Sequence, residues 1–372
     1  MNVPLLDLQA QHRTIKDEVL AAVHSVIERQ AFIMGAEVGQ LEQAMAKLCA
    51  TKHGVACASG TDALLIPLRA LALKPGDEVI SPAFTFFATA GAIANAGGKP
   101  VFVDIDAATF NVSPAAIEAA ITPRTKAIVV VHLYGQMVEI EKIAALARKR
   151  DIPLIEDGAQ AIGSRRKVDG RWLAVGELGT VGTLSFFPTK NLGGWGDGGM
   201  MVTQDDAFAA KLRSQRLHGG VREYYHDEVG LNSRLDTLQA AVLLAKLNHL
   251  ADWNVARRRI AAHYDAQFKG LGAVVAPRVD EGNEHIYHQY TIRAERRDQL
   301  TEHLKAKGIG HKVYYPLALH HQPCFASLGY KTGSLPVTEK ATAEVVSLPI
   351  YPELTEAQLA AVIAAIRGFY GA

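Results

Sequence analysis

Short apolar segments alternate with longer segments of helical periodicity across residues 37–202 of the chain. Several of these segments are apolar without interruption, which is typical of strands buried on both faces of a sheet. Between them, Leu64, Leu68 and Leu71 repeat at helical spacing. The pattern predicts an α/β domain in which helices cover a mostly parallel sheet. The candidate strands are Gly54–Ala58, Glu78–Ser81, Val101–Asp104, Ala127–Leu133, Pro153–Asp157, Thr183–Phe187 and Gly199–Thr203.

The pattern changes after Asn232, where one long helix is predicted from Leu235 to about Lys269. The rest of the chain mixes a strand with shorter helices, which predicts a smaller α+β domain. We therefore expect a large domain over residues 1–250, including an N-terminal arm, and a small domain over residues 251–372. The elements expected in the small domain are a strand at Tyr287–Arg293, a helix at Arg297–Lys307 ended by Gly308, and a closing helix at Glu356–Phe369 capped by Thr355.

Composition narrows the classes of partner. The 372 residues include 39 Lys and Arg against 38 Asp and Glu, a formal net charge of +1. We therefore expect no bulk field that would hold nucleic acid or an anionic membrane. The longest apolar runs fall well short of the roughly 20 residues that a spanning helix needs, and the N-terminus lacks a secretory signal pattern. Three scattered cysteines suit a reducing compartment, so we expect a cytoplasmic protein.

The segment Ser59–Leu64 lies between a predicted strand and a predicted helix. A helix N-terminus offers unpaired N–H groups and a positive dipole, Gly60 allows close backbone approach, and the Thr61 hydroxyl can donate to phosphate oxygens. The segment is therefore a candidate phosphate site, although it matches neither the P-loop nor the Gly-x-Gly-x-x-Gly pattern. Taken alone, it is equally compatible with a hydroxyl side chain that merely caps the helix.

A second candidate site follows the apolar strand that ends in Glu156 and Asp157. Open α/β sheets bind ligands at the carboxyl ends of their strands. A carboxylate there can be held ionised opposite a cationic ring nitrogen, as in pyridoxal phosphate enzymes. Gln160 is close enough in the sequence to reach the same ligand. The alternative is a solvated loop acid or a helix cap.

A third segment, Ser185–Gly199, carries a single lysine among several glycines. A lysine in a confined pocket can have its pKa lowered and react with an aldehyde. Lys190 is therefore a candidate nucleophile, and the preceding Ser185 offers a second hydroxyl for the phosphate. Most lysines are surface residues, which is the alternative for Lys190 taken alone.

Other chemistries have weaker support in the sequence. The pairs His320-His321 and His285 with His288 have no carboxylate or cysteine at metal-ligand spacing, so we expect no metal site. There is no Gly-x-Ser-x-Gly elbow for hydrolysis. Basic runs such as Arg257-Arg258-Arg259 are more typical of solvated helix faces than of a nucleotide contact.

Four motifs, taken in chain order, resemble the nucleotide-sugar aminotransferases of the DegT/DnrJ/EryC1/StrS family, a branch of the fold-type I pyridoxal phosphate enzymes. The resemblance extends from Leu5 to about Ile366. It implies the fold-type I architecture, with a mostly parallel mixed sheet flanked by helices and a smaller α+β C-terminal domain. The motifs are Gly60–Leu64, Glu156–Gln160, Ser185–Gly193 and Leu231–Ala241.

The resemblance assigns roles around the cofactor, pyridoxal 5'-phosphate. Lys190 is implied as the lysine that bonds to the cofactor and moves protons, Asp157 as the partner of the pyridine nitrogen, and Gln160 as the neighbour of the ring hydroxyl. The implied phosphate ligands are Gly60, Thr61 and Ser185.

Further roles concern stacking, the dimer and the substrate. Phe86 matches the family's aromatic residue that stacks on the cofactor ring, although core packing is the alternative. Asn232 matches an asparagine that reaches the cofactor phosphate of the neighbouring subunit, which implies a homodimer with shared sites. Arg234 is expected to meet a substrate anion, with an ordinary surface arginine as the alternative. Tyr314 and His320 lie in a loop that borders the sugar, and Tyr314 stands where many relatives have histidine.

The implied reaction transfers an amino group from L-glutamate to carbon 3 of a keto-sugar nucleotide, giving an amino sugar for surface polysaccharide or glycoside biosynthesis. The motifs favour UDP-2-acetamido-2-deoxy-3-oxo-glucuronate over a dTDP-3-oxo-6-deoxyhexose. Lys190 argues against the family's dehydratases, in which histidine replaces the lysine. The alternatives are transfer to carbon 4, transfer to a cyclitol ketone, and a non-catalytic regulatory protein of the same fold.

Overall fold

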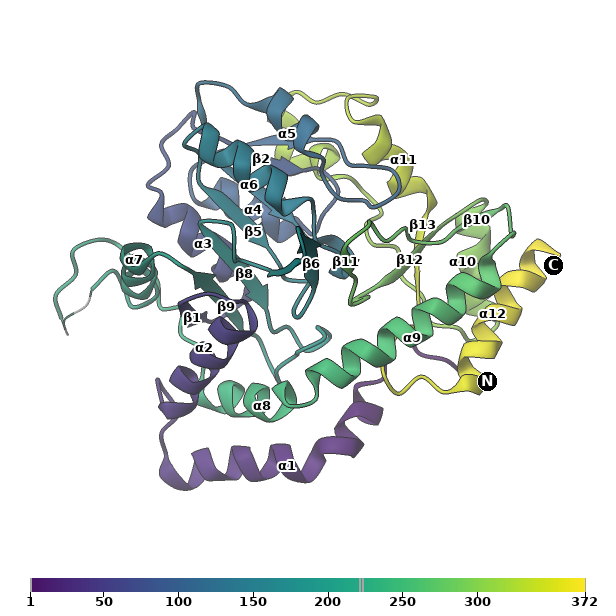
Figure 1. The fold of residues 1–372 in the computed structure, drawn as a ribbon, viewed down its shortest axis with the longest axis horizontal. Helices are drawn as coiled ribbons and strands as arrows, with labels where there is room; N and C mark the ends of the chain where they lie inside the picture. The colour runs from purple at the N-terminus through teal and green to yellow at the C-terminus, as the bar shows by residue number, and fades with distance from the viewer. Residues whose placement is uncertain (1, 221, 223, 372) are drawn as a thin grey trace.

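A seven-stranded mixed sheet forms the centre of the computed structural model, which describes residues 2–220, 222 and 224–371 (Figure 1). Five neighbouring strands, from β3 to β8, run parallel, while β9 is antiparallel to β8 and to β1. All seven strands predicted from the apolar runs are confirmed. In spatial order they are β1 (His53–Cys57), β9 (Gly199–Thr203), β8 (Val181–Ser185), β5 (Leu154–Asp157), β4 (Thr125–Val131), β2 (Glu78–Pro82) and β3 (Lys99–Val103).

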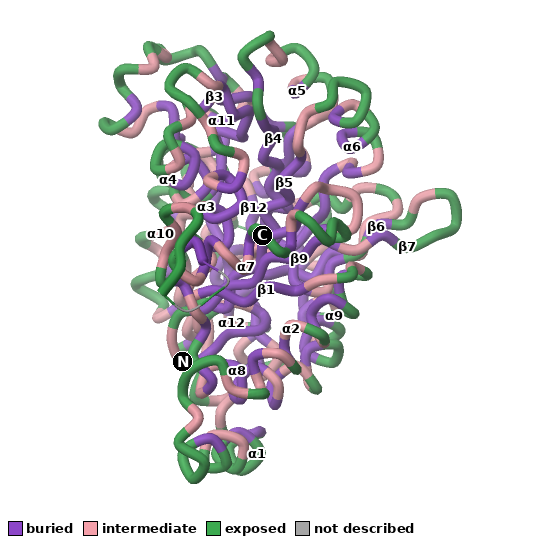
Figure 2. The backbone as a smooth tube through the Cα atoms, turned by 90° about the vertical axis from the view of Figure 1, so that its left-hand side faces the viewer, coloured by how far each residue is buried: buried purple, intermediate pink, exposed green. Residues whose placement is uncertain are grey.

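Both faces of this sheet are covered by helices. Successive residues of a strand point to opposite faces, so Val129 and Ile155 pack under α3, α4 and α7, whereas Val130 and Leu154 pack under α2, α5, α6 and α8. This two-sided burial explains the uninterrupted apolar runs (Figure 2). The helices are α2 (Ala36–Leu48), α3 (Gly60–Ala70), α4 (Phe87–Asn95), α5 (Pro114–Ala120), α6 (Ile140–Lys149), α7 (Asp206–Arg216) and α8 (Thr237–Leu247).

A second apolar core lies around the sheet β10-β12-β13 in the C-terminal part of the chain. Helix α9 (Leu250–Phe268) extends from α8 to this second core (Figure 1). The other elements there are β10 (Val274–Val275), β12 (Tyr290–Ala294), α10 (Arg297–Ala306), η2 (Leu319–His321), η3 (Pro323–Leu328), α11 (Pro336–Glu344), β13 (Val345–Leu348) and α12 (Glu356–Tyr370). The boundary at residue 250 stays a prediction.

The N-terminal arm forms helix α1 (Leu8–Arg29), which packs its Ile15 and Val19 against α8 and Trp253 of α9. A short 3-10 turn, η1 (Leu133–Gly135), follows β4. A small third sheet consists of β6 (Arg165–Val168), β7 (Arg171–Ala174) and β11 (Asn283–Glu284). These strands were not predicted, because β6 consists mostly of charged residues and the other two strands are only four and two residues long.

Two predicted elements differ from the structure. The single helix expected from Leu235 to Lys269 is wrong: it is divided into α8 and α9 at Asn248 and His249. Asparagine is a weak helix former, and both side chains bond to Glu18 of α1, at 3.2 and 2.7 Å. The strand expected from Tyr287 begins only at Tyr290, because Tyr287 has a φ of 47°, which is not extended backbone.

The small-domain helices begin where the sequence placed them. Thr355 caps α12 in a capping box with Gln358, as predicted from the threonine before the apolar helix. Ser113 caps α5 with proline at the first helical position. Among the described helices, none is both long and apolar enough to cross a bilayer.

Candidate active site

A cavity of about 290 Å³ lies at the carboxyl ends of β5 and β8, and it brings most of the predicted site residues together. Its walls also include the N-terminus of α3 and side chains from the C-terminal part of the chain. The predicted residues that line it are Gly60, Thr61, Phe86, Asp157, Gln160, Ser185, Lys190 and Tyr314. A larger open hollow between α5, α6 and β6 has acidic and basic side chains interspersed and holds none of these residues.

The predicted phosphate site is the start of α3. Ser59 caps this helix by accepting a hydrogen bond from the backbone N–H of Asp62, at 3.1 Å. Ser59 therefore does cap the helix. The N–H groups of the first helical residues, Gly60 and Thr61, remain at the cavity wall. Gly60 lies so close to β8 that a Cβ atom there would be 2.6 Å from the Cβ atom of Ser185. Only glycine lets the helix N-terminus and the Ser185 hydroxyl meet at one point.

Asp157 is the last residue of β5, and it is 4% exposed. Its carboxylate accepts hydrogen bonds from the Thr89 hydroxyl at 2.9 Å and from the Ala159 N–H at 3.1 Å. Burial raises the pKa of Asp157, while these two hydrogen bonds and the charge of Lys190 oppose the rise. The carboxyl group of Asp157 is thus almost fully buried at the cavity wall, where a cationic group of a ligand would keep it ionised.

Lys190 lies in the loop after β8, partly exposed at the cavity wall. Loss of water around the amine lowers the pKa of Lys190 to about 8, and the charge of Asp157 partly opposes the shift. A lysine with this pKa is neutral, and therefore nucleophilic, in a larger fraction of molecules than a surface lysine. The alternative of an ordinary surface lysine does not fit this position.

The amide of Gln160 is fixed at both ends. Its oxygen accepts from the backbone N–H of Tyr134 at 2.7 Å, and its nitrogen donates to the Tyr315 hydroxyl at 2.9 Å. Tyr315 also lies 6.3 Å from the ring of Phe86, centroid to centroid. Phe86 is 58% exposed, so core packing is not its role in the described chain.

The loop after Lys190 is held by contacts that the glycines make possible. Gly193 packs against the carbonyl of Pro188, where a Cβ atom would lie 2.3 Å from the oxygen. The buried amine of Lys246 donates to the carbonyl of Gly193. Gln239 accepts from the backbone N–H of Trp195 at 2.8 Å. Two residues of α8 therefore fix the loop that carries the lysine.

Several cavity residues were missed in the sequence. His288, Gln289 and Tyr315 line the cavity, and Thr89 holds Asp157. Asn191, next to the lysine, donates to Asn254 of α9 at 2.8 Å and lies 3.2 Å from Nδ1 of His288. Apolar periodicity gave no signal for these polar residues: His288, Gln289, Tyr315 and Asn191 lie on irregular backbone, and Thr89 is a polar residue within α4.

Three predicted residues lie outside the cavity of this chain. Asn232 is exposed and Arg234 is half-buried, and neither lines the cavity. His320 is buried beside Glu339 instead. Their predicted roles stay predictions.

The chain matches the profile of the DegT/DnrJ/EryC1/StrS aminotransferase family over residues 13–367. A pleiotropic regulatory protein of Geobacillus stearothermophilus is 53% identical over 372 residues, covering 100% of this chain and 99% of that protein. A UDP-N-acetyl-3-dehydro-alpha-D-glucosamine 3-aminotransferase of Acidithiobacillus ferrooxidans is 46% identical, covering 98% and 97%. A UDP-2-acetamido-2-deoxy-3-oxo-D-glucuronate aminotransferase of Pseudomonas aeruginosa is 44% identical, covering 98% and 99%.

Solved structures agree with these relatives. DesV of S. venezuelae in complex with a ketimine intermediate superposes with a TM-score of 0.96 at 40% identity, covering 100% of this chain and 99% of that one. NtdA of Bacillus subtilis with bound cofactor PMP has a TM-score of 0.91 at 32% identity, covering 100% and 86%. The predicted fold class is confirmed, and the chain belongs to the DegT/DnrJ/EryC1/StrS aminotransferase family.

Proposed function

We propose that this aminotransferase moves the amino group of L-glutamate to carbon 3 of a UDP-linked 2-acetamido-2-deoxy-3-oxo sugar. The observation that carries the proposal is the meeting of Lys190 and Asp157 in one cavity beside a helix N-terminus. Transamination needs an amine of lowered pKa and a buried acid that face the same cavity.

The residues present fit pyridoxal 5'-phosphate. The start of α3 with Thr61 and Ser185 would hold the phosphate, Asp157 the ring nitrogen, and Gln160 the edge of the ring. Phe86 is exposed enough to cover a ring face. When bound, the cofactor supplies an aldehyde and an electron sink for the carbanion formed at the substrate's α-carbon.

Lys190 is the residue that moves the proton. Its Nζ atom, when neutral, can accept the proton of the donor's α-carbon and give it back as an ammonium. A cationic ring nitrogen bound opposite Asp157 would keep this carboxylate ionised. Thr89 keeps that carboxylate oriented through its hydroxyl. One lysine therefore acts as base and as acid in both halves of a ping-pong cycle.

The substrate is proposed from the named relatives. Those described as acting on UDP-linked 3-oxo sugars are 46% and 44% identical, and one described as a dTDP-3-amino-3,4,6-trideoxy-alpha-D-glucose transaminase is 40% identical. The glucuronate stays our favoured substrate, although the described cavity wall of one chain carries Lys190 and no arginine. We propose that its carboxylate meets Arg234 of a second subunit.

The exposed surface supports the proposal of a site shared between two subunits. The segment between α7 and α8 projects from the body of the chain, at the left of Figure 1, and carries Tyr224 and Val229 in exposed positions. Phe187 and Trp195 at the lysine loop are 49% and 45% exposed. We propose a homodimer in which this segment brings Asn232 to the partner's phosphate and covers these apolar side chains. The cytoplasmic location stays a prediction.

A regulatory function is the second candidate, because the relative that is 53% identical is described as a pleiotropic regulatory protein. A purely regulatory function would require that this chain has lost its catalytic activity. The assembled cavity with Lys190 and Asp157 supports turnover instead.

Reduction with borohydride should fix pyridoxal phosphate to Lys190. Peptide mapping of the reduced holoenzyme is expected to give one labelled lysine, and Lys190→Ala should give none. Lys246 is an internal control, because burial lowers the pKa of its amine to about 8 as well, yet it does not line the cavity. A label on Lys246, or no label at all, would contradict the assignment.

A panel of keto-sugar nucleotides with glutamate tests the substrate. We expect 2-oxoglutarate formation to be fastest with the UDP-linked 3-oxo-glucuronate, followed by its 3-oxo-glucosamine counterpart. Arg234→Gln should raise KM about tenfold for the uronate alone, equal to about 1.4 kcal/mol of lost binding. Arg148→Gln, on the exposed end of α6, serves as the control. Preference for a 4-oxo sugar or a cyclitol ketone would overturn the assignment to carbon 3, and no turnover with any ketone would favour the regulatory candidate.

Mixed dimers test whether the sites are shared. Asn232→Ala and Lys190→Ala subunits should each be inactive or impaired alone. Unfolding and refolding equal amounts of the two variants together should restore at most about a quarter of wild-type activity. About half of the dimers are then hybrids, and each hybrid has one intact site of two. If native mass spectrometry detects hybrid dimers but activity is not restored, each chain completes its own site.

Removing the charge of Asp157 should change the titration of Lys190. The attraction of Asp157 favours the ammonium, so Asp157→Asn should lower the pKa of Lys190 below about 8 in the cofactor-free protein. The pH dependence of amine modification at Lys190, followed by peptide mapping, measures this shift. Asp252→Asn, on the exposed face of α9, should leave the curve unchanged. An unchanged or higher pKa in Asp157→Asn would show that the two groups are not coupled.

A further inference from the structure

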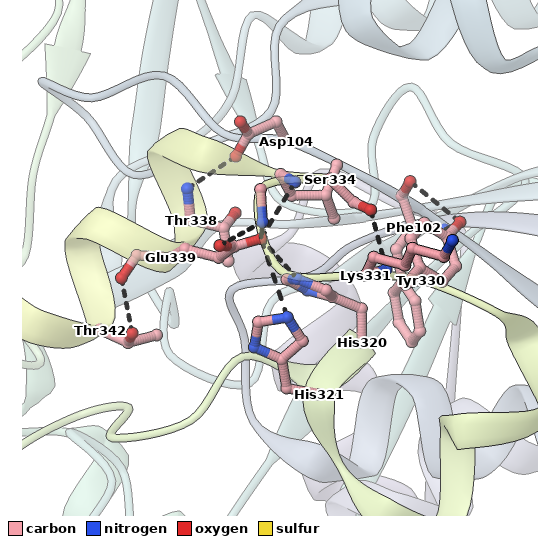
Figure 3. A network of polar contacts seen from close by, with 12 residues as sticks. Phe102, Asp104, His320, His321, Tyr330, Lys331, Ser334, Thr338, Glu339 and Thr342 are labelled. Atoms are coloured by element: carbon pink, nitrogen blue, oxygen red, sulfur yellow. Dashed lines mark hydrogen bonds and ion pairs between the residues drawn. The ribbon is translucent and has the colours of Figure 1, made fainter.

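A second cluster of chemically active side chains lies outside the cavity. It consists of His320 and His321 of η2 and Glu339 of α11, which we call the His–Glu cluster (Figure 3). The two segments meet beside the end of β3, where Asp104 accepts the backbone N–H groups of Val337 and Thr338, at 2.9 and 2.7 Å. This contact could not be predicted from the sequence, because Glu339 is distant from the histidine pair and lies on another helix.

The separations of the three side chains suit one small ion. Nε2 of His320 lies 3.2 Å and Nε2 of His321 lies 3.8 Å from Oε1 of Glu339. One ligand atom from each residue falls within 4.8 Å of the other two. Ligands about 2.0 Å from a tetrahedral zinc ion are about 3.3 Å apart. The observed separations therefore need adjustments of up to about 1.5 Å.

The histidines have unused binding capacity. Nδ1 of His320 and Nε2 of His321 are buried and have no hydrogen-bond partner among the described residues. The His320 side chain is completely buried, and the His321 side chain is 25% exposed. A buried imidazole nitrogen without a partner is costly, and an ion bound at Nε2 of His321 would satisfy that nitrogen.

The carboxylate of Glu339 is already oriented. The backbone N–H of Gly333 donates to both of its oxygens, at 2.9 and 2.8 Å, and the N–H of Leu335 donates to Oε1 at 3.3 Å. Such outer hydrogen bonds are typical of carboxylates that bind metals, because they fix the ligand before the ion arrives.

The charge in the cluster also favours a cation. A glutamate side chain ordinarily carries a negative charge at neutral pH. Within the described chain, the only ion-pair partners of Glu339 are these two histidines. The cluster thus carries a negative charge with no lysine or arginine to balance it.

We propose that the His–Glu cluster is a binding site for a divalent transition-metal ion of the zinc class, with His320, His321 and Glu339 as ligands and water in the fourth position. Two imidazoles and one carboxylate select zinc-class ions over Mg²⁺ and Ca²⁺, which prefer oxygen ligands alone. Binding at Nε2 of His320 moves its proton to Nδ1, so the histidine stays neutral. The ion joins η2 to α11 and thereby holds the segment that follows Tyr314 and Tyr315. This site is independent of the proposed transamination.

Titration of the full-length holoenzyme with Zn²⁺ and Co²⁺, after treatment with a chelator, tests the site. We expect one ion per chain by calorimetry, a visible Co²⁺ spectrum of tetrahedral type, and a higher melting temperature with metal than without. His321→Leu should lose all three effects. His263→Leu, which removes an exposed histidine of α9, should keep them.

His320→Gln and Glu339→Gln serve as second variants, each checked for folding by its melting temperature without metal and by its cofactor absorbance. The proposal would be overturned if calorimetry of the wild-type protein did not show one bound ion per chain. Binding that persists unchanged in His321→Leu would also overturn it, because the ion would then lie elsewhere. Since cofactor attachment at Lys190 is measured separately, failure of the metal site leaves the proposed function untouched.

Discussion

The site depends on keeping an amine and a carboxylate close together and largely out of water. Asp157 ends β5, and Lys190 lies in the loop after the neighbouring parallel strand β8; the carboxyl ends of the two strands lie at the same edge of the sheet. Burial raises the pKa of Asp157 and lowers the pKa of Lys190. The rest of the cavity supports this pair: Thr89 bonds to the acid, and the helix start at Gly60 completes the wall. The position of this pair therefore depends on the adjacency of β5 and β8 and on the loop that carries Lys190.

The lysine loop shows how the helices stabilise this arrangement. A glycine-rich loop has high conformational entropy when free, so its shape must be fixed by contacts. Lys246 and Gln239 of α8 supply two of these contacts, and Asn191 ties the loop to α9. Lys246 is itself a buried amine whose pKa is lowered to about 8. The protein thus uses one costly buried lysine to position the loop that bears another.

Much of the fold could be predicted because burial on both faces leaves a strong apolar signal, as in β4 and β5. The same reasoning failed where backbone is charged or irregular, as in β6 and at Tyr287, and where one residue breaks a helix, as at Asn248. For the site, the motifs pointed to Lys190, Asp157 and Gln160, which the fold brings into one cavity. The motifs did not predict that His288 and Tyr315 line the cavity, or that Asn191 bonds to Asn254. These residues come together from segments that are distant in the sequence. Glu339 beside His320 is the same kind of meeting, created by the fold alone.

Helix α9 has a mechanical consequence. It packs Trp253 against α1 and α8, bonds Asn254 to Asn191 beside the lysine, and buries Tyr264 in the second core. Its 19 residues span roughly 28 Å without a glycine or proline. Such a helix resists bending along its length, so a hinge between the two cores would lie at the break before it, where Asn248 and His249 bond to Glu18 of α1. Because Asn254 ties α9 to the lysine loop, we expect the lysine and the C-terminal core to move together, and different sugars to be accommodated by side chains at the cavity wall.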